Sequence, residues 1–243
     1  MHSSLNMKNN PLRSASNNID CLKLLSCLAS LSQADFEMLA GYGDAKIYTS
    51  NSHIQAYCDS KPACFYIKAG LLKLFRHDEY GAEVVLIILG PGELIINGLQ
   101  NFNGFKGLHI TALTECVLVP LDRQVLEKLL VNNVAFASGL LLMQNELFLV
   151  ASDRFRKDQS SAANKILATI VYMASKWSDN GRNIDFIGKI GHQQCAIIAN
   201  VARETFSRVL GKLKDKNYIV SDGQGGIILA DKALKHVCDT YVG

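Results

Sequence analysis

The chain has 243 residues, of which 49% are hydrophobic and 19% charged, and its formal net charge is +3. This composition excludes a largely disordered chain, and the length suffices for two domains with substantial cores. The seven cysteines, an odd number without a tight framework, exclude a disulfide-stapled secreted domain; they indicate free thiols in a reducing compartment, so we expect a cytoplasmic location.

The N-terminal residues 1–18 are rich in Ser and Asn and have too little apolar content to pack, so we predict a disordered arm and no signal peptide. Leucines recur at three- and four-residue steps over 19–39, which predicts one or two short helices, the second capped by Ser32. The most apolar run, 139–151, is interrupted by polar residues, so we expect no membrane span.

The segment 45–121 changes to short β-rich runs separated by turn residues such as Gly90-Pro91-Gly92. Eight brief strands of this kind predict a closed or rolled sheet. We expect them at 47–49, 54–57, 64–68, 71–75, 83–89, 94–96, 109–113 and 116–119.

Beyond Asp122 the pattern is helical, and the longest predicted helix runs from about Val134 to Lys157. Its apolar residues step by four and three in a heptad-like seam that includes Phe136, Leu140 and Leu147, while further leucines broaden the apolar face. Such a helix fits between the rolled sheet on one side and a twin helix on the other. A buried helix of a monomer is the alternative.

We place the domain boundary after this helix, which gives an arm at 1–18, a sheet domain at 19–130, a connecting helix at 131–159 and a C-terminal domain at 160–243. The last carries 11 Lys and Arg against 7 Asp and Glu, while residues 1–159 carry 14 against 15. A basic excess of this size fits a nucleic-acid-binding module. Within it we predict a helix over 166–177, a strand at 184–187, a glycine-rich hairpin at 218–229 and a last helix at 231–241.

The stretch 192–217 predicts a helix, a turn and a second helix. In the second helix one apolar stripe must face a core: Phe206, Val209, Leu210 and Leu213. The opposite face is polar and carries Arg203, Glu204, Ser207, Arg208 and Gly211. Asn200 lies at the turn, where a left-handed backbone is needed that Asn tolerates. This is the layout of a helix-turn-helix, with an ordinary solvated helix pair as the alternative.

The run from Arg203 to Leu210 resembles the recognition helix of the CRP/FNR superfamily of bacterial transcription regulators, and the spacing of Glu204, Ser207 and Arg208 resembles its FNR branch. The runs 65–70 and 91–93 resemble strand and turn motifs of that family's β-roll. The resemblance implies an α+β fold: an N-terminal jelly-roll-like β-roll, a long dimerisation helix and a C-terminal winged helix-turn-helix. Ala202 departs from it, because a capping Ser is usual there.

The resemblance implies a homodimer that binds double-stranded DNA at a palindrome with half-sites like TTGA, and it allows RNA polymerase as a further partner. Glu204, Ser207 and Arg208 would face base edges, with Arg208 suited to guanine and Glu204 to cytosine. We count four more residues as DNA-binding candidates: Gln193, Arg203, Lys212 and Lys214. The two lysines would contact phosphates and set affinity without choosing sequence.

The ligand pocket departs from members that bind cyclic AMP, in which a Gly-Glu pair and an Arg-Ser or Arg-Thr pair hold ribose and phosphate. Here the acidic position falls on Asn97, and the Arg-Ser pair falls on Lys106-Gly107 or on Gly107-Leu108. Because a buried phosphate needs a bidentate cation, we expect that cyclic AMP is not the signal, and the effector stays unspecified.

The thiols raise a second question, because FNR-like members hold an iron–sulfur cluster. Cys21, Cys27 and Cys116 lie near such positions, but the N-terminal spacing offers two cysteines instead of three. We expect buried structural thiols and no cofactor, with a cluster as the alternative.

No phosphate loop, nucleophile elbow or metal-binding histidine spacing is present, so we do not expect an enzyme. The sequence therefore predicts a DNA-binding transcription regulator. The alternative is a nucleotide- or redox-sensing regulatory subunit that acts on a protein partner instead of DNA.

Overall fold

The computed structural model describes residues 31–40, 43–54, 64–96, 108–155, 161–177, 182–221 and 226–241, and every structural statement below concerns these ranges. The predicted arm at 1–18 lies outside them. The N-terminal half begins with one helix, α2 (Gln33–Ala40), whose Asp35 backbone N–H donates to the predicted cap Ser32 at 3.2 Å. Seven strands follow: β1 (Lys46–Tyr48), β2 (Cys64–Ala69), β3 (Leu72–His77), β4 (Glu83–Leu89), β5 (Leu94–Ile96), β6 (His109–Ala112) and β7 (Cys116–Pro120).

These strands form two antiparallel sheets, with strand orders β1-β7-β2-β5 and β4-β3-β6. Apolar side chains from both sheets meet in one core, among them Ile67, Leu72, Ile110 and Leu118. The predicted rolled sheet is thus confirmed. Of the strand expected at 54–57, the first residue is described as part of the coil beside an isolated bridge between His53 and Thr111, and 55–57 lie outside the described residues.

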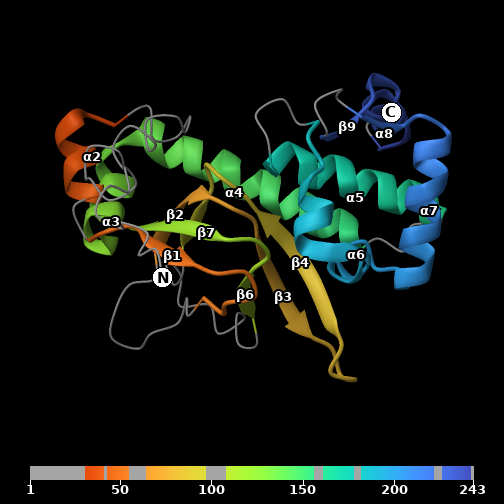
Figure 1. The fold of residues 1–243 in the computed structure, drawn as a ribbon. Coiled ribbons are helices and arrows are strands. Elements are labelled where there is room, and N and C mark those ends of the chain that lie inside the picture. The colour runs from red at the N-terminus through yellow and green to blue at the C-terminus, as the bar shows by residue number, and fades with distance from the viewer. Residues whose placement is uncertain are drawn as a thin grey trace, which may run out of the picture.

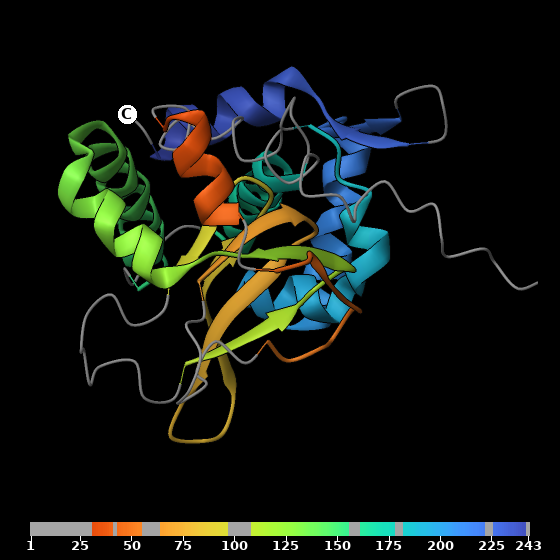
Figure 2. The ribbon, with the colours of Figure 1, turned by 90° about the vertical axis from the view of Figure 1, so that its left-hand side faces the viewer.

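Helix α2 and the two helices that follow strand β7 pack at one end of the roll. Asp122 caps α3 (Arg123–Asn132) by accepting the Gln124 and Val125 N–H groups. The long helix begins at Val134 as predicted, as α4 (Val134–Phe155), and the last two residues expected in it, 156–157, lie outside the described residues. Asn133 separates α4 from α3 and accepts the Phe136 N–H at 3.0 Å. Figures 1 and 2 show α2 and α3 together at this end, with α4 running from there toward the C-terminal half.

The C-terminal half contains α5 (Ala162–Trp177), α6 (Phe186–Ile198), α7 (Arg203–Asp215), β8 (Ile219–Ser221), β9 (Ile227–Leu229) and α8 (Asp231–Tyr241). We call this unit the winged-helix domain, because β8 and β9 pair as an antiparallel hairpin beside the α6–α7 pair. The strand predicted at 184–187 is wrong. Asn183 makes only an isolated bridge to Ile228, and helix α6 already begins at Phe186.

The winged-helix domain does not stand apart from the roll but packs on the outer face of the β4-β3-β6 sheet. Successive strand residues point to opposite faces, so Leu72 and Leu74 face the roll core while Phe75 faces the domain. Phe75, Val85 and Ile88 join one apolar cluster with residues of α5, α6 and α7. Figure 1 shows α5 and α6 beside β4.

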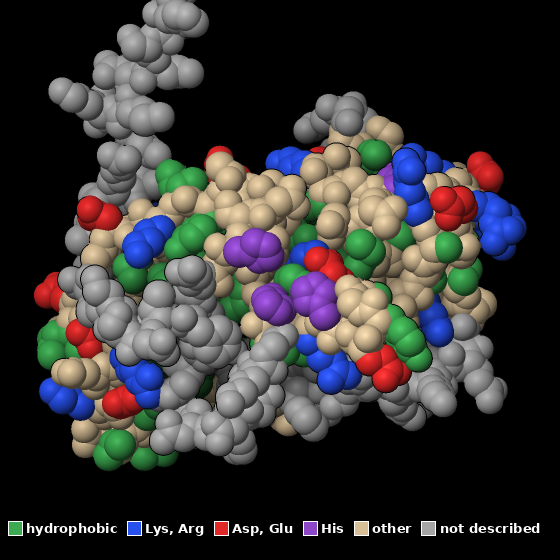
Figure 3. Space-filling model, turned by 90° about the horizontal axis from the view of Figure 1, so that it is seen from below, with side chains coloured by type: hydrophobic (Ala, Val, Ile, Leu, Met, Phe, Trp, Pro, Cys, Tyr) green, Lys and Arg blue, Asp and Glu red, His purple; other side chains and the backbone are tan. Residues whose placement is uncertain are grey.

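The part of this sheet face that the domain does not cover is exposed and carries a group of histidines (Figure 3). His77 on β3 and His109 on β6 stack edge to face with ring centroids 5.2 Å apart, and His53 Nδ1 lies 3.1 Å from Thr111 Oγ1. Within the described ranges, no group of three or more His, Cys, Asp or Glu residues has the arrangement to hold a metal ion.

No single helix in the described residues combines the length and apolar character needed to cross a membrane. The one pair there that meets both criteria together is α3 with the first half of α4, and it is bent by 109°. Its inward residues Leu126, Leu129 and Phe136 are buried against the roll.

Candidate nucleic-acid interface

The helix-turn-helix is built around two backbone irregularities. Gly191 interrupts α6 with φ +78°, a conformation that disfavours residues with a Cβ, so a regular helix resumes only at His192. Asn200 adopts φ +52° in the turn, as predicted, and the Val201 N–H donates to the Ala196 carbonyl at 3.0 Å. The predicted first helix therefore corresponds to the second part of α6.

Helix α7 presents its predicted apolar stripe to the core of the domain. The stripe residues Phe206, Val209, Leu210 and Leu213 are all buried. Cys195 of α6 is buried in the same cluster, as expected for a structural residue. Desolvation raises the pKa of its thiol to about 12. It is therefore a thiol at neutral pH and packs as a small apolar side chain.

The opposite face of α7 is open to solvent. Arg203, Glu204 and Arg208 are exposed, and so is Gly211, where no atom would touch an added Cβ. Glu204 and Arg208 are four residues apart, but they form no ion pair in the described part of the chain. Within that part, the guanidinium groups of Arg203 and Arg208 therefore lie on this face without a carboxylate partner.

Ser207 differs from its neighbours on that face. It is half-buried, and its Oγ lies 2.9 Å from Nδ1 of His192 on α6. Its hydroxyl is therefore not free in solvent, because the first residue of the preceding regular helix reaches it, and the expectation that Ser207 faces base edges stays a prediction. Helical periodicity places Ser207 on the correct side of α7 but carries no information about a partner 15 residues away.

The remaining candidates surround this face. Gln193 is exposed at the start of the regular part of α6, and Lys212 and Lys214 are exposed in the last turn of α7. Ala202 precedes α7 in the extended conformation of an N-cap (φ −66°, ψ 147°) but makes no side-chain capping hydrogen bond. The departure noted in the sequence therefore leaves the first turn of α7 without a side-chain cap.

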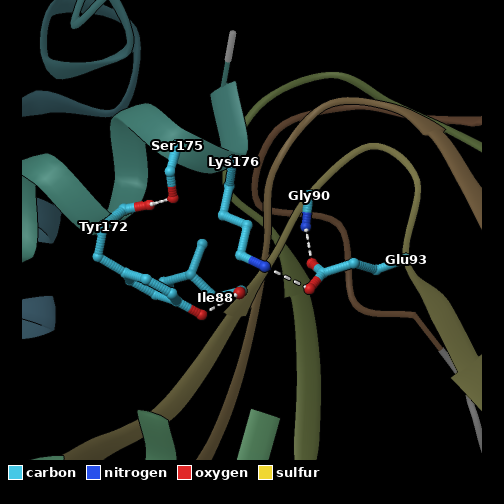
Figure 4. A network of polar contacts seen from close by, with 6 residues as sticks. All are labelled: Ile88, Gly90, Glu93, Tyr172, Ser175 and Lys176. Atoms are coloured by element: carbon cyan, nitrogen blue, oxygen red, sulfur yellow. Dashed lines mark hydrogen bonds and ion pairs between the residues drawn. The ribbon is translucent and has the colours of Figure 1, made fainter. Parts of the chain in front are cut away.

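A second polar site, not predicted, joins the domain to the roll (Figure 4). Glu93, next to β5, accepts a hydrogen bond from Lys176 Nζ of α5 at 2.6 Å and one from the Gly90 N–H at 2.7 Å. The Tyr172 hydroxyl donates to the Ile88 carbonyl at 2.8 Å. Gly90 is required there, because a Cβ would lie 2.7 Å from the Lys176 carbonyl oxygen.

A third contact reaches the helix-turn-helix itself. Lys73 of β3 is 3% exposed, pairs with Glu83 of β4 and donates to Gln194 Oε1 of α6 at 3.2 Å. Close by, a groove of about 470 Å³ separates the start of β4 from the turn before α7. Its lining residues are Ala82, Glu83, Ile197, Asn200, Val201 and Ala202.

Most positions expected to form the ligand pocket and the iron–sulfur site are not among the described residues. Asn97, Lys106, Gly107, Cys21 and Cys27 all lie outside the described ranges. Cys116 is described and fully buried, with Sγ 3.3 Å from the carbonyl oxygens of Leu71 and Thr114.

Burial is the main cause that raises the pKa of the Cys116 thiol, to about 11. The thiol can donate to these carbonyl oxygens and packs as a small buried side chain, which is how a structural cysteine behaves.

Comparison with known proteins matches two parts of the chain to family models. Residues 45–133 match the cyclic nucleotide-binding domain, and residues 164–236 match the Crp-like helix-turn-helix domain. The cyclic AMP receptor protein of Thermus thermophilus is 23% identical in an alignment of 212 residues that covers 84% of this chain and 92% of that protein.

Solved structures share the fold. FixK2 from Bradyrhizobium japonicum superposes with a TM-score of 0.62 at 19% identity, covering 79% of this chain and 94% of its own. A CRP/FNR-family transcriptional regulator from Thermus thermophilus superposes with a TM-score of 0.52 at 20% identity, covering 80% and 98%. With its cyclic nucleotide-binding domain followed by a Crp-like helix-turn-helix, the chain belongs to the CRP/FNR superfamily of transcription regulators.

Proposed function

We propose that this regulator is a sequence-specific DNA-binding protein that works in the cytoplasm as a homodimer on a palindromic site. The observation that supports it best is the division of α7 into a buried apolar stripe and an exposed face carrying Arg203, Glu204 and Arg208. A helix anchored along one side and polar along the other is suited to lie in a major groove.

The residues in the middle of that face contact the base edges. Arg208 offers a planar fork that fits the O6 and N7 acceptors of guanine, and Glu204 offers an acceptor for the amino group of cytosine. Neither side chain has an ion-pair partner to give up within the described residues. Ser207 contacts a thymine of a half-site like TTGA.

Affinity without sequence choice comes from the polar groups at the edge of the face. Lys212 and Lys214 follow the readout residues in the last turn of α7 and contact phosphates, while Gln193 and Arg203 contact the DNA backbone near the turn. Neutralised phosphates release counterions, so binding weakens steeply as salt rises. A protein partner in place of DNA need not show that slope.

The experiment is selection of bound DNA from a random pool, followed by affinity measurements at several salt concentrations. Arg208→Ala should cost roughly 1–3 kcal/mol, mostly at the guanine position, whereas Lys212→Ala should weaken all sequences alike. The matched pair removes one cation each from the same helix. Absence of a palindrome, or a base preference that changes with Lys212→Ala and not with Arg208→Ala, contradicts the proposal.

The dimer uses the outer side of α4. Phe136 and Leu140 are buried within their own roll, whereas Leu141 is 71% and Leu142 66% exposed. A second copy of the helix covers these leucines, since a monomer leaves them in water.

Sedimentation tests the dimer with Leu141→Glu/Leu142→Glu, which should run as a monomer at micromolar concentration. Lys128→Glu introduces the same carboxylate at an exposed position of α3, so it serves as the control and should stay dimeric. A wild type that is monomeric at micromolar concentration overturns this part of the proposal.

The roll responds to a signal other than cyclic AMP, because Asn97, Lys106 and Gly107 supply no arginine for a buried phosphate. The Thermus relative is named as a cyclic AMP receptor, so the two proteins offer a direct comparison. Calorimetric titration of both with cyclic AMP should give heat only for the relative. Micromolar binding that also strengthens DNA binding by this chain contradicts the expectation.

A further inference from the structure

We propose that His192 is a positioning residue that sets, through Ser207, which base α7 accepts at one position of the half-site. This role rests on the proposed DNA-binding function and adds a residue from the neighbouring helix to the readout.

The geometry holds the imidazole in place from two sides. His192 is the first residue of α6 after the break at Gly191, and its Nδ1 lies 2.9 Å from Ser207 Oγ. Its ring packs at a centroid distance of 5.7 Å on Phe206, which is fully buried. His192 and Ser207 are both half-buried, so the pair lies where the core of the domain meets the exposed face of α7.

The chemistry of the pair links the proton on the ring to the hydroxyl. A serine hydroxyl has one proton and two acceptor sites, and a neutral imidazole has one donor nitrogen and one acceptor nitrogen. If Ser207 donates its proton to Nδ1, the oxygen can only accept, which suits the amino group of adenine or cytosine. If Nδ1–H donates to Oγ, the hydroxyl proton is free for thymine O4 or for guanine.

The proposed thymine contact needs the second arrangement, in which Nδ1 carries the proton. His192 then acts on the base without touching it, because it uses one acceptor site of the hydroxyl and leaves the proton directed outward. A histidine that only contacted a phosphate would instead strengthen binding to every sequence equally.

Two variants of similar chemistry separate these roles. His192→Asn keeps a hydrogen-bonding atom at about the place of Nδ1, whereas His192→Gln moves its amide to about the place of Nε2, out of reach of Ser207. Both remain polar and suit a half-exposed site. Ser207→Ala identifies the base position that the hydroxyl governs, and affinities for the four bases at that position are the measurement.

We expect His192→Gln to reduce discrimination at the Ser207 position by roughly 2–10-fold, the effect of one hydrogen bond, with other positions and the salt slope unchanged. His192→Asn should stay within about twofold of the wild type, by the same reasoning. His192→Gln combined with Ser207→Ala should change the preference no more than Ser207→Ala alone, because the two residues act as one unit.

Equal weakening of all sequences, a change at another base position, or additive effects in the double variant would overturn the inference. If His192→Gln does not fold, His192→Phe repeats the test, since it keeps a ring against Phe206 without a nitrogen. If the wild type selects no sequence at all, it is the proposed function that fails. A wild type that selects a palindrome unaffected by His192→Gln refutes the role of His192 alone.

Discussion

The winged-helix domain has two charged surfaces that differ in how their charges are satisfied. Where it meets the roll, Lys176 is paired with Glu93, and Lys73 of the roll contacts both Glu83 and Gln194. On the exposed face of α7, Arg203 and Arg208 have no carboxylate partner among the described residues.

The difference follows from what each surface faces. A charge taken out of water is costly unless it is paired, so the contact with the roll includes its own counter-charges. A surface that meets a polyanion needs the opposite arrangement, in which cations stay solvated until phosphate and base edges replace the water. In the same domain, as far as the structure describes it, the charges that meet the roll are thus paired, whereas the cations on the exposed face of α7 remain solvated and unpaired.

The largest effect is expected at the contact between the roll and the winged-helix domain. Phe75 is 1% exposed and joins the roll to the apolar cluster of the winged-helix domain. Phe75→Ala should lower the free energy of unfolding by about 3–5 kcal/mol, because it removes a large buried ring from a shared core. Urea unfolding measures this.

The matched control for Phe75 is Tyr80→Ala, in the turn after the same strand. Tyr80 is 86% exposed, so its removal should change the stability by no more than about 0.5 kcal/mol. Equal costs for the two variants would mean that roll and domain do not share a core in solution.

A smaller effect is expected from the ion pair that Figure 4 shows between Glu93 and Lys176. Glu93→Gln keeps an acceptor for the Gly90 N–H but leaves the Lys176 ammonium, whose side chain is 23% exposed, without its carboxylate. We expect a loss of about 1–3 kcal/mol, less than for a fully buried pair because water still reaches the lysine.

The exposed pair of Arg123 and Glu127 provides the comparison, since it joins the same kinds of charge one helical turn apart. Glu127→Gln should cost about 0.5 kcal/mol or less, and added salt should remove most of that cost. Should the two glutamine variants be equally stable, the contact between roll and domain does not bury its charges in solution.

Sequence patterns predicted the elements well where the signal was local. The bounds of β4, β5 and α8 agree with the expected ones, since alternation, turn residues and helical spacing are all contained in a few neighbouring residues. The failure at 184–187 has a local cause too. Ile184, Phe186 and Ile187 form a short apolar run, and such a run does not distinguish a strand from a buried helix start.

Long-range contacts could not be predicted. Glu93 and Lys176 are 83 positions apart, and Lys73 and Gln194 are 121 apart, so only the folded chain brings them together. A lysine in a β-strand is typical of a surface residue, and nothing in its neighbourhood indicates that another domain will cover it.

The smallest effect is expected at the start of α7, next to its exposed face. Ala202 has the extended backbone of an N-cap but no side-chain acceptor for the first N–H groups of the helix, and it lies on the groove beside Glu83. Ala202→Ser adds such an acceptor and should stabilise the protein by about 1 kcal/mol, seen as a rise of the thermal midpoint.

Ala202→Val adds bulk without an acceptor and should give no gain. An equal rise for both variants would show that filling the groove, and not capping, is the cause. Because neither change touches Glu204 or Arg208, the bases selected by α7 should stay the same, which separates the stability of the reading helix from what it reads.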